Sequence, residues 1–454
     1  MMKHLLLTLF VLAFTGTTLS AYDFEVDGIY YDRKSDGTVE VTFKDTNYES
    51  YSGNVVIPET VSYNNVNYTV ASIGSRAFYD CSGLTGIEIP NTITKIGSEA
   101  FYDCLFLTEI EIPQSVAEIA VTAFNFCCRV ERMTVDPDNT VYDSREDCNA
   151  IIKTESNELL AGCMNTVIPN TVTGIGPSAF RGCHGLTNIE IPNSVNSIGD
   201  YAFAACEHLT SIVIPASVTS IGYQILFVTP RLEHIAVEAG NTAYDSRKSC
   251  NALIETATNT LLKGCKNSFI PNTVTRIETE AFGSIHGLTS VIIPNSVTQI
   301  GESAFSYCYD LTTIEIPESV RLIEDYLLEG SRNVEKIICR WKYPPSARNI
   351  WYYETHNSEG VSCYKATKLY VPKGYVNEYK GSLDWRKFEN ILELTDAGSG
   401  DVNGDGKFSI GDVTALINLV LTGGDASPYC DVNFDGRVNI SDVTALISWI
   451  LSGN

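Results

Sequence analysis

The chain has 454 residues, of which 44% are hydrophobic, and a formal net charge of −24. This composition is typical of a folded protein rather than a disordered one, and the length allows more than one domain. The acidic balance argues against nucleic acid and anionic membrane surfaces as partners, because both require clustered lysines and arginines.

Residues 1–21 have the pattern of a secretory signal peptide. Lys3 precedes an apolar run from Leu5 to about Thr15, and small residues follow as far as Ala21. The run is too short to span a bilayer as a stable helix, and no second run of spanning length follows it. We therefore expect cleavage after Ala21 and a secreted or cell-surface protein with no membrane span.

Residues 22–52 alternate apolar and polar side chains around Asp36-Gly37. This pattern predicts a β-hairpin. A stack of repeats exposes an apolar edge at each end, so we expect the hairpin to act as an N-terminal cap.

Residues 53–340 repeat. Isoleucine-proline pairs recur every 23 residues, and two wider gaps each hold one further 23-residue unit and one 33-residue unit, which gives a super-repeat of 102 residues. The spacing of Leu209, Ile212 and Ile214 matches the strand of a leucine-rich repeat. Strand alternation should turn Ile212 and Ile214 inward and Val213 outward. Stacked units would bury one continuous core.

These repeats resemble the BspA-type leucine-rich repeat family of secreted and surface bacterial proteins. The stretch "CNAIIKTESNELLAGC" at 148–163 is similar to the hairpin insert of that family. The resemblance implies a β-rich α/β leucine-rich repeat solenoid, and a role in adhesion or host-matrix binding.

Six of the fourteen cysteines follow the repeat phenylalanine by three residues. Ile285 occupies the same slot in one unit, which predicts a ladder of buried free thiols rather than disulfides. The ladder consists of Cys81, Cys104, Cys127, Cys183, Cys206 and Cys308. For the pairs Cys148–Cys163 and Cys250–Cys265, which face each other if the hairpin turn is symmetric, a cross-strand disulfide and two core thiols both remain open.

The outward strand positions give a candidate binding face for a host or bacterial surface protein. Its apolar members are Val213, Phe269 and Ile292. The alternative is a solvated acidic face with scattered apolar residues. We find no catalytic motif and no metal-like histidine spacing, so we predict no catalytic residues, although carboxylates brought together by folding would suit a hydrolase.

Residues 341–394 are similar to the closing segment of such repeat proteins and predict a C-terminal cap. The polar stretch "TDAGSG" at 395–400 predicts a short linker to the last domain.

Residues 401–454 contain two acidic dodecamers, at 401–412 and 431–442. Positions 1, 3, 5, 7, 9 and 12 of each carry oxygen ligands in the pattern of an EF-hand loop, and glycine stands at position 6, where the chain turns sharply. We predict two calcium ions. Their ligands would be Asp401, Asn403, Asp405, the Lys407 carbonyl, Ser409 and Asp412 in the first loop, and Asp431, Asn433, Asp435, the Arg437 carbonyl, Asn439 and Asp442 in the second.

One amphipathic helix follows each loop, and no helix precedes it. Two such loop–helix units resemble a type I dockerin, which implies a cohesin-like partner. The residues that set partner choice in that family correspond to Ile410, Gly411, Ile440 and Ser441, with Ile417, Asn418, Ile447 and Ser448 on the helices. The usual Ser-Thr and Lys-Arg pairs are missing, so a cellulosomal cohesin does not follow. The alternative is a small calcium-stapled domain that only caps or spaces.

The sequence thus predicts a secreted, non-enzymatic protein-binding or adhesion-type repeat protein with a calcium-dependent docking tail. The first alternative is an accessory component of a polysaccharide-degrading assembly recruited by dockerin–cohesin pairing. The second is a carboxylate-based hydrolase.

Overall fold

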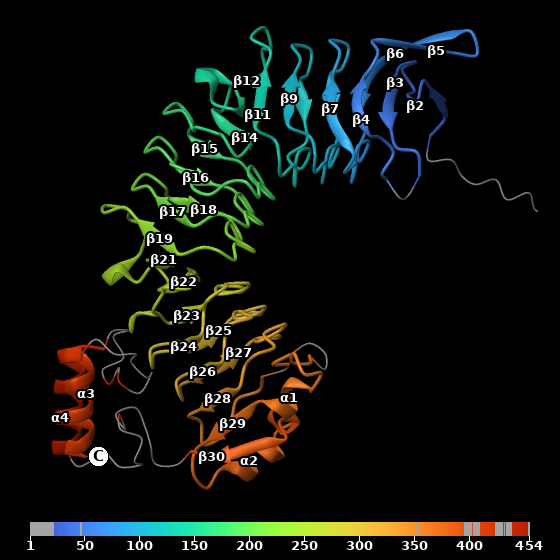
Figure 1. The fold of residues 1–454 in the computed structure, drawn as a ribbon. Helices are drawn as coiled ribbons and strands as arrows, with labels where there is room; N and C mark the ends of the chain where they lie inside the picture. The colour runs from blue at the N-terminus through green and yellow to red at the C-terminus, as the bar shows by residue number, and fades with distance from the viewer. Residues whose placement is uncertain are drawn as a thin grey trace, which may run out of the picture.

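The computed structural model describes residues 22–45, 48–347, 349–351, 355–394, 402, 409–422, 430, 432 and 438–452. The expected signal peptide, the linker and most of both calcium loops lie outside these residues. Short strands stack side by side along an arc from β1 to β30, and two antiparallel helices follow (Figure 1). Of the helices in the described ranges, none is long and apolar enough to cross a membrane.

The N-terminal segment forms an antiparallel sheet. Strands β1 (Phe24–Val26), β2 (Ile29–Arg33) and β3 (Val39–Thr42) pair in sequence order. The β2–β3 turn contains Gly37 at a φ of +85°, a conformation that glycine adopts without strain. A second hairpin, β5 (Thr60–Tyr63) with β6 (Val66–Ile73), lies within the region expected to be solenoid.

The repeats form two sets of parallel strands. In regular steps from coil to coil the paired residues are 23 positions apart, as in Ile212↔Ile235. Where a strand of a hairpin insert pairs with the next coil they are 16 apart, as in Leu159↔Ile175. The first set contains β6, β8 (Lys95–Ile96), β10 (Glu118–Ile119), β14 (Glu158–Gly162), β15 (Gly174–Ile175), β16 (Ser197–Ile198), β18 (Ser220–Ile221), β22 (Thr260–Lys263), β23 (Arg276–Ile277), β25 (Gln299–Ile300) and β27 (Leu322–Ile323). The second contains β4 (Gly53–Val56), β7 (Leu84–Glu88), β9 (Glu109–Ile112), β11 (Arg132–Val135), β17 (Ser211–Ile214), β19 (His234–Val237), β24 (Ser290–Ile292), β26 (Thr313–Ile316) and β28 (Lys336–Cys339).

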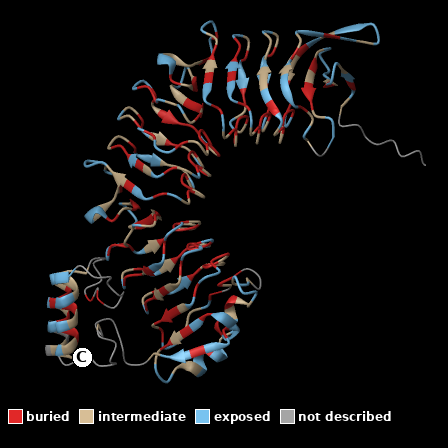
Figure 2. Cartoon of the chain, viewed as in Figure 1, coloured by how far each residue is buried: buried red, intermediate tan, exposed pale blue. Residues whose placement is uncertain are grey.

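The core lies between the two sets of strands (Figure 2). In β17, Ile212 and Ile214 are buried whereas Val213 is 41% exposed, as the alternation predicts. The repeat phenylalanines stack from coil to coil, with ring centroids 5.0 Å apart for Phe78–Phe101. Further stacked pairs are Phe180–Phe203 and Phe282–Phe305, each at 5.2 Å.

The cysteine ladder joins consecutive coils. The Cys104 thiol donates a hydrogen bond to the Phe78 carbonyl at 3.1 Å, 26 residues earlier in the chain. Ser331 stands in the equivalent slot and donates to the Phe305 carbonyl at 2.7 Å. The same bond recurs from Cys127 to Phe101, from Cys206 to Phe180 and from Cys308 to Phe282. The slot therefore holds a small hydrogen-bond donor in several coils, and buried Ile285 shows that it also accepts an apolar side chain.

Two hairpin inserts interrupt the coils. The first contains β12 (Tyr142–Asp143), η1 (Arg145–Asp147), β13 (Ala150–Lys153) and β14, and the second contains β20 (Tyr244–Asp245), η2 (Arg247–Ser249), β21 (Leu253–Glu255) and β22. Gly162 lets the Phe180 ring pack against the first hairpin, because an added Cβ would lie 2.2 Å from that ring.

All fourteen cysteines are free thiols in the structure. In the first insert, the register shifts between Ile151 and Ile152, so the hairpin is not symmetric about its turn. Cys148 and Cys163 consequently pack in two different core clusters. The second insert has the same shift between Leu253 and Ile254. Both pairs are core thiols and not cross-strand disulfides.

The last part of the solenoid is closed by a mixed segment. It contains α1 (Cys363–Ala366), β29 (Lys368–Val371), α2 (Val376–Gly381), η3 (Trp385–Lys387) and β30 (Asn390–Glu393). β29 and β30 extend the sheet of β24, β26 and β28. Trp351, Tyr379 and Trp385 fill its interior and leave almost no area exposed. This burial covers the apolar edge that the final coil would otherwise expose.

Candidate functional site

The two C-terminal helices are α3 (Ile410–Thr422) and α4 (Ile440–Ser452). Their buried side chains form a cluster of their own, separate from the solenoid core. It consists of Val413, Leu416, Cys430, Val432, Val443 and Leu446. The tail thus has its own small core, and Cys430, which the sequence pattern left unassigned, belongs to it.

Each helix begins with an exposed isoleucine. Ile410 is 73% exposed and Ile440 is 67% exposed. Ile417 and Ile447 follow on the same two helices and are about one-third exposed, at 36% and 38%. Two apolar side chains in matching positions of a duplicated unit form a candidate contact surface that is presented twice.

A buried carboxylate lies in the first turn of each helix. Asp412 and Asp442 have no exposed area. The Ser409 amide donates to Asp412 Oδ2 at 2.8 Å, and the Asn439 amide donates to Asp442 Oδ2 at 2.9 Å. These are the ninth and twelfth positions of each dodecamer, so the structure places two expected ligands of each loop next to each other.

The remaining expected calcium ligands lie outside the described residues: Asp401, Asn403, Asp405, Lys407, Asp431, Asn433, Asp435 and Arg437. Among the residues that are described, no group of three or more histidine, cysteine or acidic side chains is arranged to hold a metal ion. The chemistry of the set nevertheless fits calcium, because every expected donor is a hard oxygen atom and the two carboxylates at position 12 are already withdrawn from solvent.

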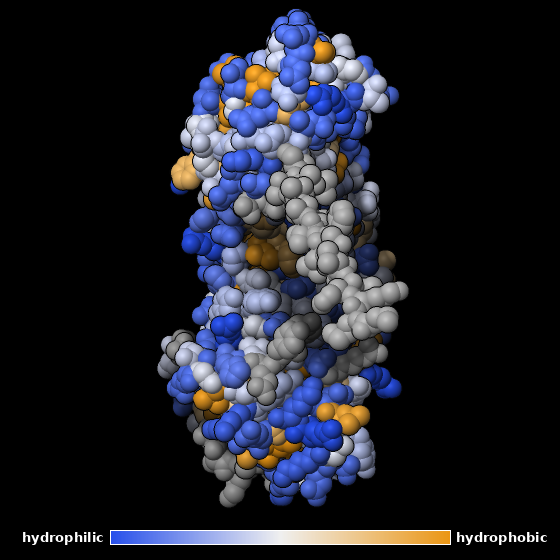
Figure 3. Space-filling view, turned by 90° about the vertical axis from the view of Figure 1, so that its right-hand side faces the viewer, coloured by the Kyte–Doolittle hydropathy of each residue, from blue (hydrophilic) through white to orange (hydrophobic). Residues whose placement is uncertain are grey.

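The expected apolar binding face on the solenoid is not brought together. Val213 lies on β17 and Ile292 on β24, which belong to different sheets, and Ile292 is half-buried. Phe269 lies in irregular chain after the second hairpin and packs against the core, because the insert leaves no strand at that position. The face in Figure 3 is largely hydrophilic, with small and separated hydrophobic areas.

One pair of titratable groups was not singled out by the sequence pattern. Lys263 is 6% exposed, and its ammonium donates to the carbonyls of Glu280 at 3.2 Å and Gly283 at 3.3 Å. Burial lowers the pKa of Lys263 to about 8, although the charge of Glu280 opposes this effect. Burial also raises the pKa of Glu280, whose Oε2 accepts from Ser306 Oγ at 2.9 Å. The signal in the sequence was the 102-residue super-repeat, which places Lys263 where the first insert has Ala161.

Family models match most of the chain. The BspA type leucine rich repeat region matches residues 59–154, 156–261 and 259–350. The dockerin type I domain matches residues 399–451. Both kinds of region are typically non-catalytic, and no catalytic domain is matched.

Several solved structures are similar to the chain. A leucine rich cell surface protein from Faecalibacterium prausnitzii is 26% identical, with 82% of this chain and 94% of that chain covered and a TM-score of 0.49. A leucine-rich repeat protein from Eubacterium ventriosum is 19% identical, with 81% and 83% covered and a TM-score of 0.45. A leucine-rich repeat protein from Bacteroides ovatus is 24% identical, with 82% and 77% covered and a TM-score of 0.36. No curated protein matches the chain.

Proposed function

The chain belongs to the BspA-type leucine-rich repeat proteins, and we propose that it is a secreted, non-enzymatic binding protein that its dockerin domain docks to a cohesin-type module. The repeats then act at the cell surface or outside the cell, as adhesion-type modules that contact a host or bacterial surface protein. The arrangement has two separate parts, because the helices have their own core and the solenoid has its own closing segment.

The observation that carries the docking function is the duplicated exposure of Ile410 and Ile440. Each stands at the first position of its helix, next to a buried carboxylate that closes the preceding loop. Matching large apolar side chains that are exposed at the same position of a duplicated unit support a contact surface that a partner would cover. Because Gly411 and Ser441 follow them with little bulk, a partner can approach the helix ends closely.

Calcium is the proposed structural ion, with one ion in each dodecamer and the twelve oxygen ligands named from the sequence. Asp412 and Asp442 link these loops to the helices, because they sit in the first helical turn and in the buried core at once. A bound cation would neutralise these buried carboxylates and hold the helix starts in place.

The proposed boundaries are a signal peptide at 1–21, a hairpin cap at 22–52, a solenoid of 23-residue units and 102-residue super-repeats at 53–340, a C-terminal cap at 341–394, a linker at 395–400 and a docking domain at 401–454. Coil-to-coil pairing at 23 residues and two inserts in matching positions support the repeat lengths. Within the solenoid, Val213 is the strongest member of the expected apolar set, because its side chain reaches solvent from a strand.

The test is a pull-down with the chain from residue 22 to 454 immobilised, offered the secreted and surface proteins of the producing bacterium, with calcium and with a chelator. We expect a cohesin-type protein to be captured only with calcium. Since the surface is duplicated, Ile410→Asp or Ile440→Asp alone should retain capture, whereas the double variant should lose it. Val167→Asp is the matched control, because Val167 is a 72% exposed apolar residue on the solenoid.

Capture that persists in the chelator, or in the double variant, would contradict the docking proposal. Capture of a polysaccharide-degrading enzyme complex through the same calcium-dependent surface would make the protein an accessory of that assembly. Binding of a host matrix protein regardless of calcium would assign the recognition to the solenoid.

A further inference from the structure

The two hairpin inserts create two junctions at which the coil before the insert meets the coil after it. The junctions are equivalent in sequence, because residues 121–183 and 223–285 are 102 positions apart. The two junctions can therefore be compared position by position, and differences in their packing can be assigned to the residues that differ between them.

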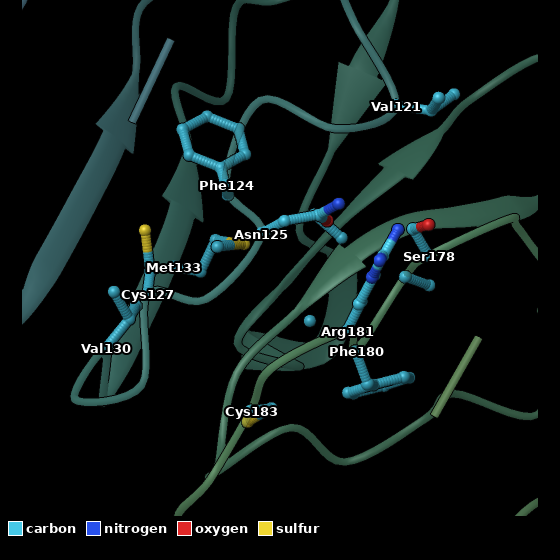
Figure 4. A pocket seen from close by; sticks show the side chains of 13 residues that line it. Val121, Phe124, Asn125, Cys127, Val130, Met133, Ser178, Phe180, Arg181 and Cys183 are labelled. Atoms are coloured by element: carbon cyan, nitrogen blue, oxygen red, sulfur yellow. The ribbon is translucent and has the colours of Figure 1, made fainter. Parts of the chain in front are cut away.

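The first junction is nearly solid. Its cavity measures about 10 Å³, which is space for the centre of about one water molecule. Side chains from both coils line it, among them Phe124, Met133 and Phe180 (Figure 4). The Phe126 amide donates to the Arg181 carbonyl at 3.0 Å, so the backbone ladder continues across the insert.

The second junction is hollow. Its cavity measures about 370 Å³, within the size range of small-molecule sites in proteins. The Gly283 carbonyl, equivalent to that of Arg181, accepts from the Lys263 ammonium and not from a backbone amide. The lysine thus occupies the carbonyl that the first junction uses in its backbone ladder. The two coils are joined further along, where the His286 amide donates to the Pro230 carbonyl at 3.0 Å, and the cavity lies beside this contact.

The lining of this cavity combines aromatic and acidic side chains. Tyr223 is 50% exposed at the cavity and lies in the field of Glu278, Glu280 and Glu302. The rest of the lining includes Phe227, Tyr244, Glu255 and Leu262. In the first junction, Val121 stands in place of Tyr223 and Ser178 in place of Glu280, so the ring and the carboxylate occur only at the hollow junction.

The charges at the cavity do not cancel. Glu255, Glu278 and Glu280 line the cavity, and the one cation in the lining is Lys263, whose buried ammonium is already held by two carbonyls. Glu278 also pairs with the Arg276 guanidinium, which is shared between Glu278 at 3.3 Å and Glu324 at 3.6 Å. An acidic, partly desolvated cavity disfavours anions, and an aromatic ring at its opening favours a cation with an apolar body.

We propose that the cavity between the coil of Ile221–Phe227 and the coil of Glu278–Glu280 binds a small organic cation, a protonated amine with an apolar body. The ammonium contacts Glu280 and the face of Tyr223, and the apolar body fills the space beside Phe227 and Leu262. This site is separate from the dockerin surface and does not depend on the proposed docking.

The test is calorimetric titration of the chain from residue 22 to 454 with phenethylamine at neutral pH. The neutral and anionic counterparts are phenethyl alcohol and hydrocinnamate, and cellobiose serves as a polyol probe. We expect phenethylamine to bind at one site per chain, and each counterpart to bind at least roughly tenfold more weakly, because it lacks the charge that the carboxylates recognise.

Two variants place the binding at this cavity. Tyr223→Ala and Glu280→Gln should each weaken phenethylamine binding roughly tenfold, through the lost ring contact and the lost charge respectively. Val121→Ala is the matched control at the filled junction and should leave binding unchanged. Tyr223 is half exposed, so its replacement should leave the fold intact even if the Glu280 variant unfolds.

Equal binding of phenethylamine and phenethyl alcohol would overturn the proposal, as would binding that both variants leave unchanged. Absence of phenethylamine binding would also overturn it. A preference for cellobiose over the amine would mean that the cavity takes a polyol.

Discussion

Cys148 and Cys163 lie on the same hairpin but on opposite sides of it, so that Cys148 packs with the coils that follow the insert and Cys163 with the coils that precede it. A one-residue shift in register separates them. Their thiols donate to different backbone carbonyls, at 3.7 Å to Ala150 for Cys148 and at 3.4 Å to Asn149 for Cys163. The hairpin therefore joins two core clusters without a covalent bridge.

From this arrangement we predict that the denatured, unreduced protein exposes all fourteen thiols to a colorimetric thiol reagent. In the native protein at neutral pH these thiols should react slowly, because they are buried and burial raises the pKa of Cys148 to about 11. Cys128 is only half-buried and should react first. If the denatured protein lacks the four reactive thiols of the two hairpin pairs, both inserts contain a disulfide.

A second prediction concerns Asn139, which is buried beside the first insert. Its amide donates to the carbonyls of Pro113 and Val116 at 2.9 and 3.0 Å, and its oxygen accepts from the amides of Val141 and Tyr142. Asn139→Ala leaves these four partners unsatisfied and should lower the free energy of unfolding by about 3 kcal/mol in urea denaturation.

The control for that variant is Asn165→Ala. Asn165 is exposed and donates one bond, at 3.2 Å to the Glu131 carbonyl, so its loss should change stability by less than about 0.5 kcal/mol. Asn241 repeats the four bonds of Asn139 in the second insert, and Asn241→Ala should match Asn139→Ala. If Asn139→Ala and Asn165→Ala lower the free energy of unfolding equally, the hydrogen bonds of Asn139 do not stabilise the insert.

A third prediction follows from the pKa of Lys263, which burial lowers from 10.5 to about 8. A folded-state pKa below the unfolded value means that protonation opposes folding. The penalty is therefore full below about pH 8 and disappears as the pH rises towards 10.5. Lys263→Met removes this titration, so its stability relative to the natural chain should fall by about 3 kcal/mol between pH 7 and pH 10.5.

The measurement is urea denaturation of both proteins at each pH, and the quantity of interest is their difference. In this difference the contribution of the cysteines and tyrosines cancels, because their raised pKa values lower the free energy of unfolding of both proteins equally at high pH. Ala161→Met at the equivalent place in the first insert is the control, and its effect should not vary with pH. A pH-independent difference for Lys263→Met would show that the ammonium is not buried.

A fourth prediction concerns calcium. Asp405→Ala combined with Asp435→Ala removes one carboxylate ligand from each proposed loop and should unfold the helices α3 and α4 in calcium, while the solenoid keeps its structure. Circular dichroism should show the loss of helical signal, and a chelator should produce the same loss in the natural chain. A helical signal that both treatments leave unchanged would contradict the calcium sites.

Much of the solenoid followed from the sequence because strand alternation is rigid. Ile212 and Ile214 could only face the core if Val213 faced out. The register shift at Ile151 was not predictable, since a bulge leaves no mark in the apolar pattern, and it decides the state of the cysteines. Phe269 was expected on a strand, but the hairpin before it leaves the chain irregular there. Lys263 could have been found by aligning the super-repeats, which places it against Ala161.

The direction of the side-chain bonds between coils has a consequence for how the protein forms. Cys104, Ser115 and Asn139 each donate to a carbonyl that lies 22 to 26 residues earlier in the chain. A polypeptide that is synthesised from its N-terminus therefore meets acceptors that are already in place. Each new coil can settle on its predecessor before the next one appears, which allows the stack to grow in the order of synthesis from the antiparallel sheet at Phe24.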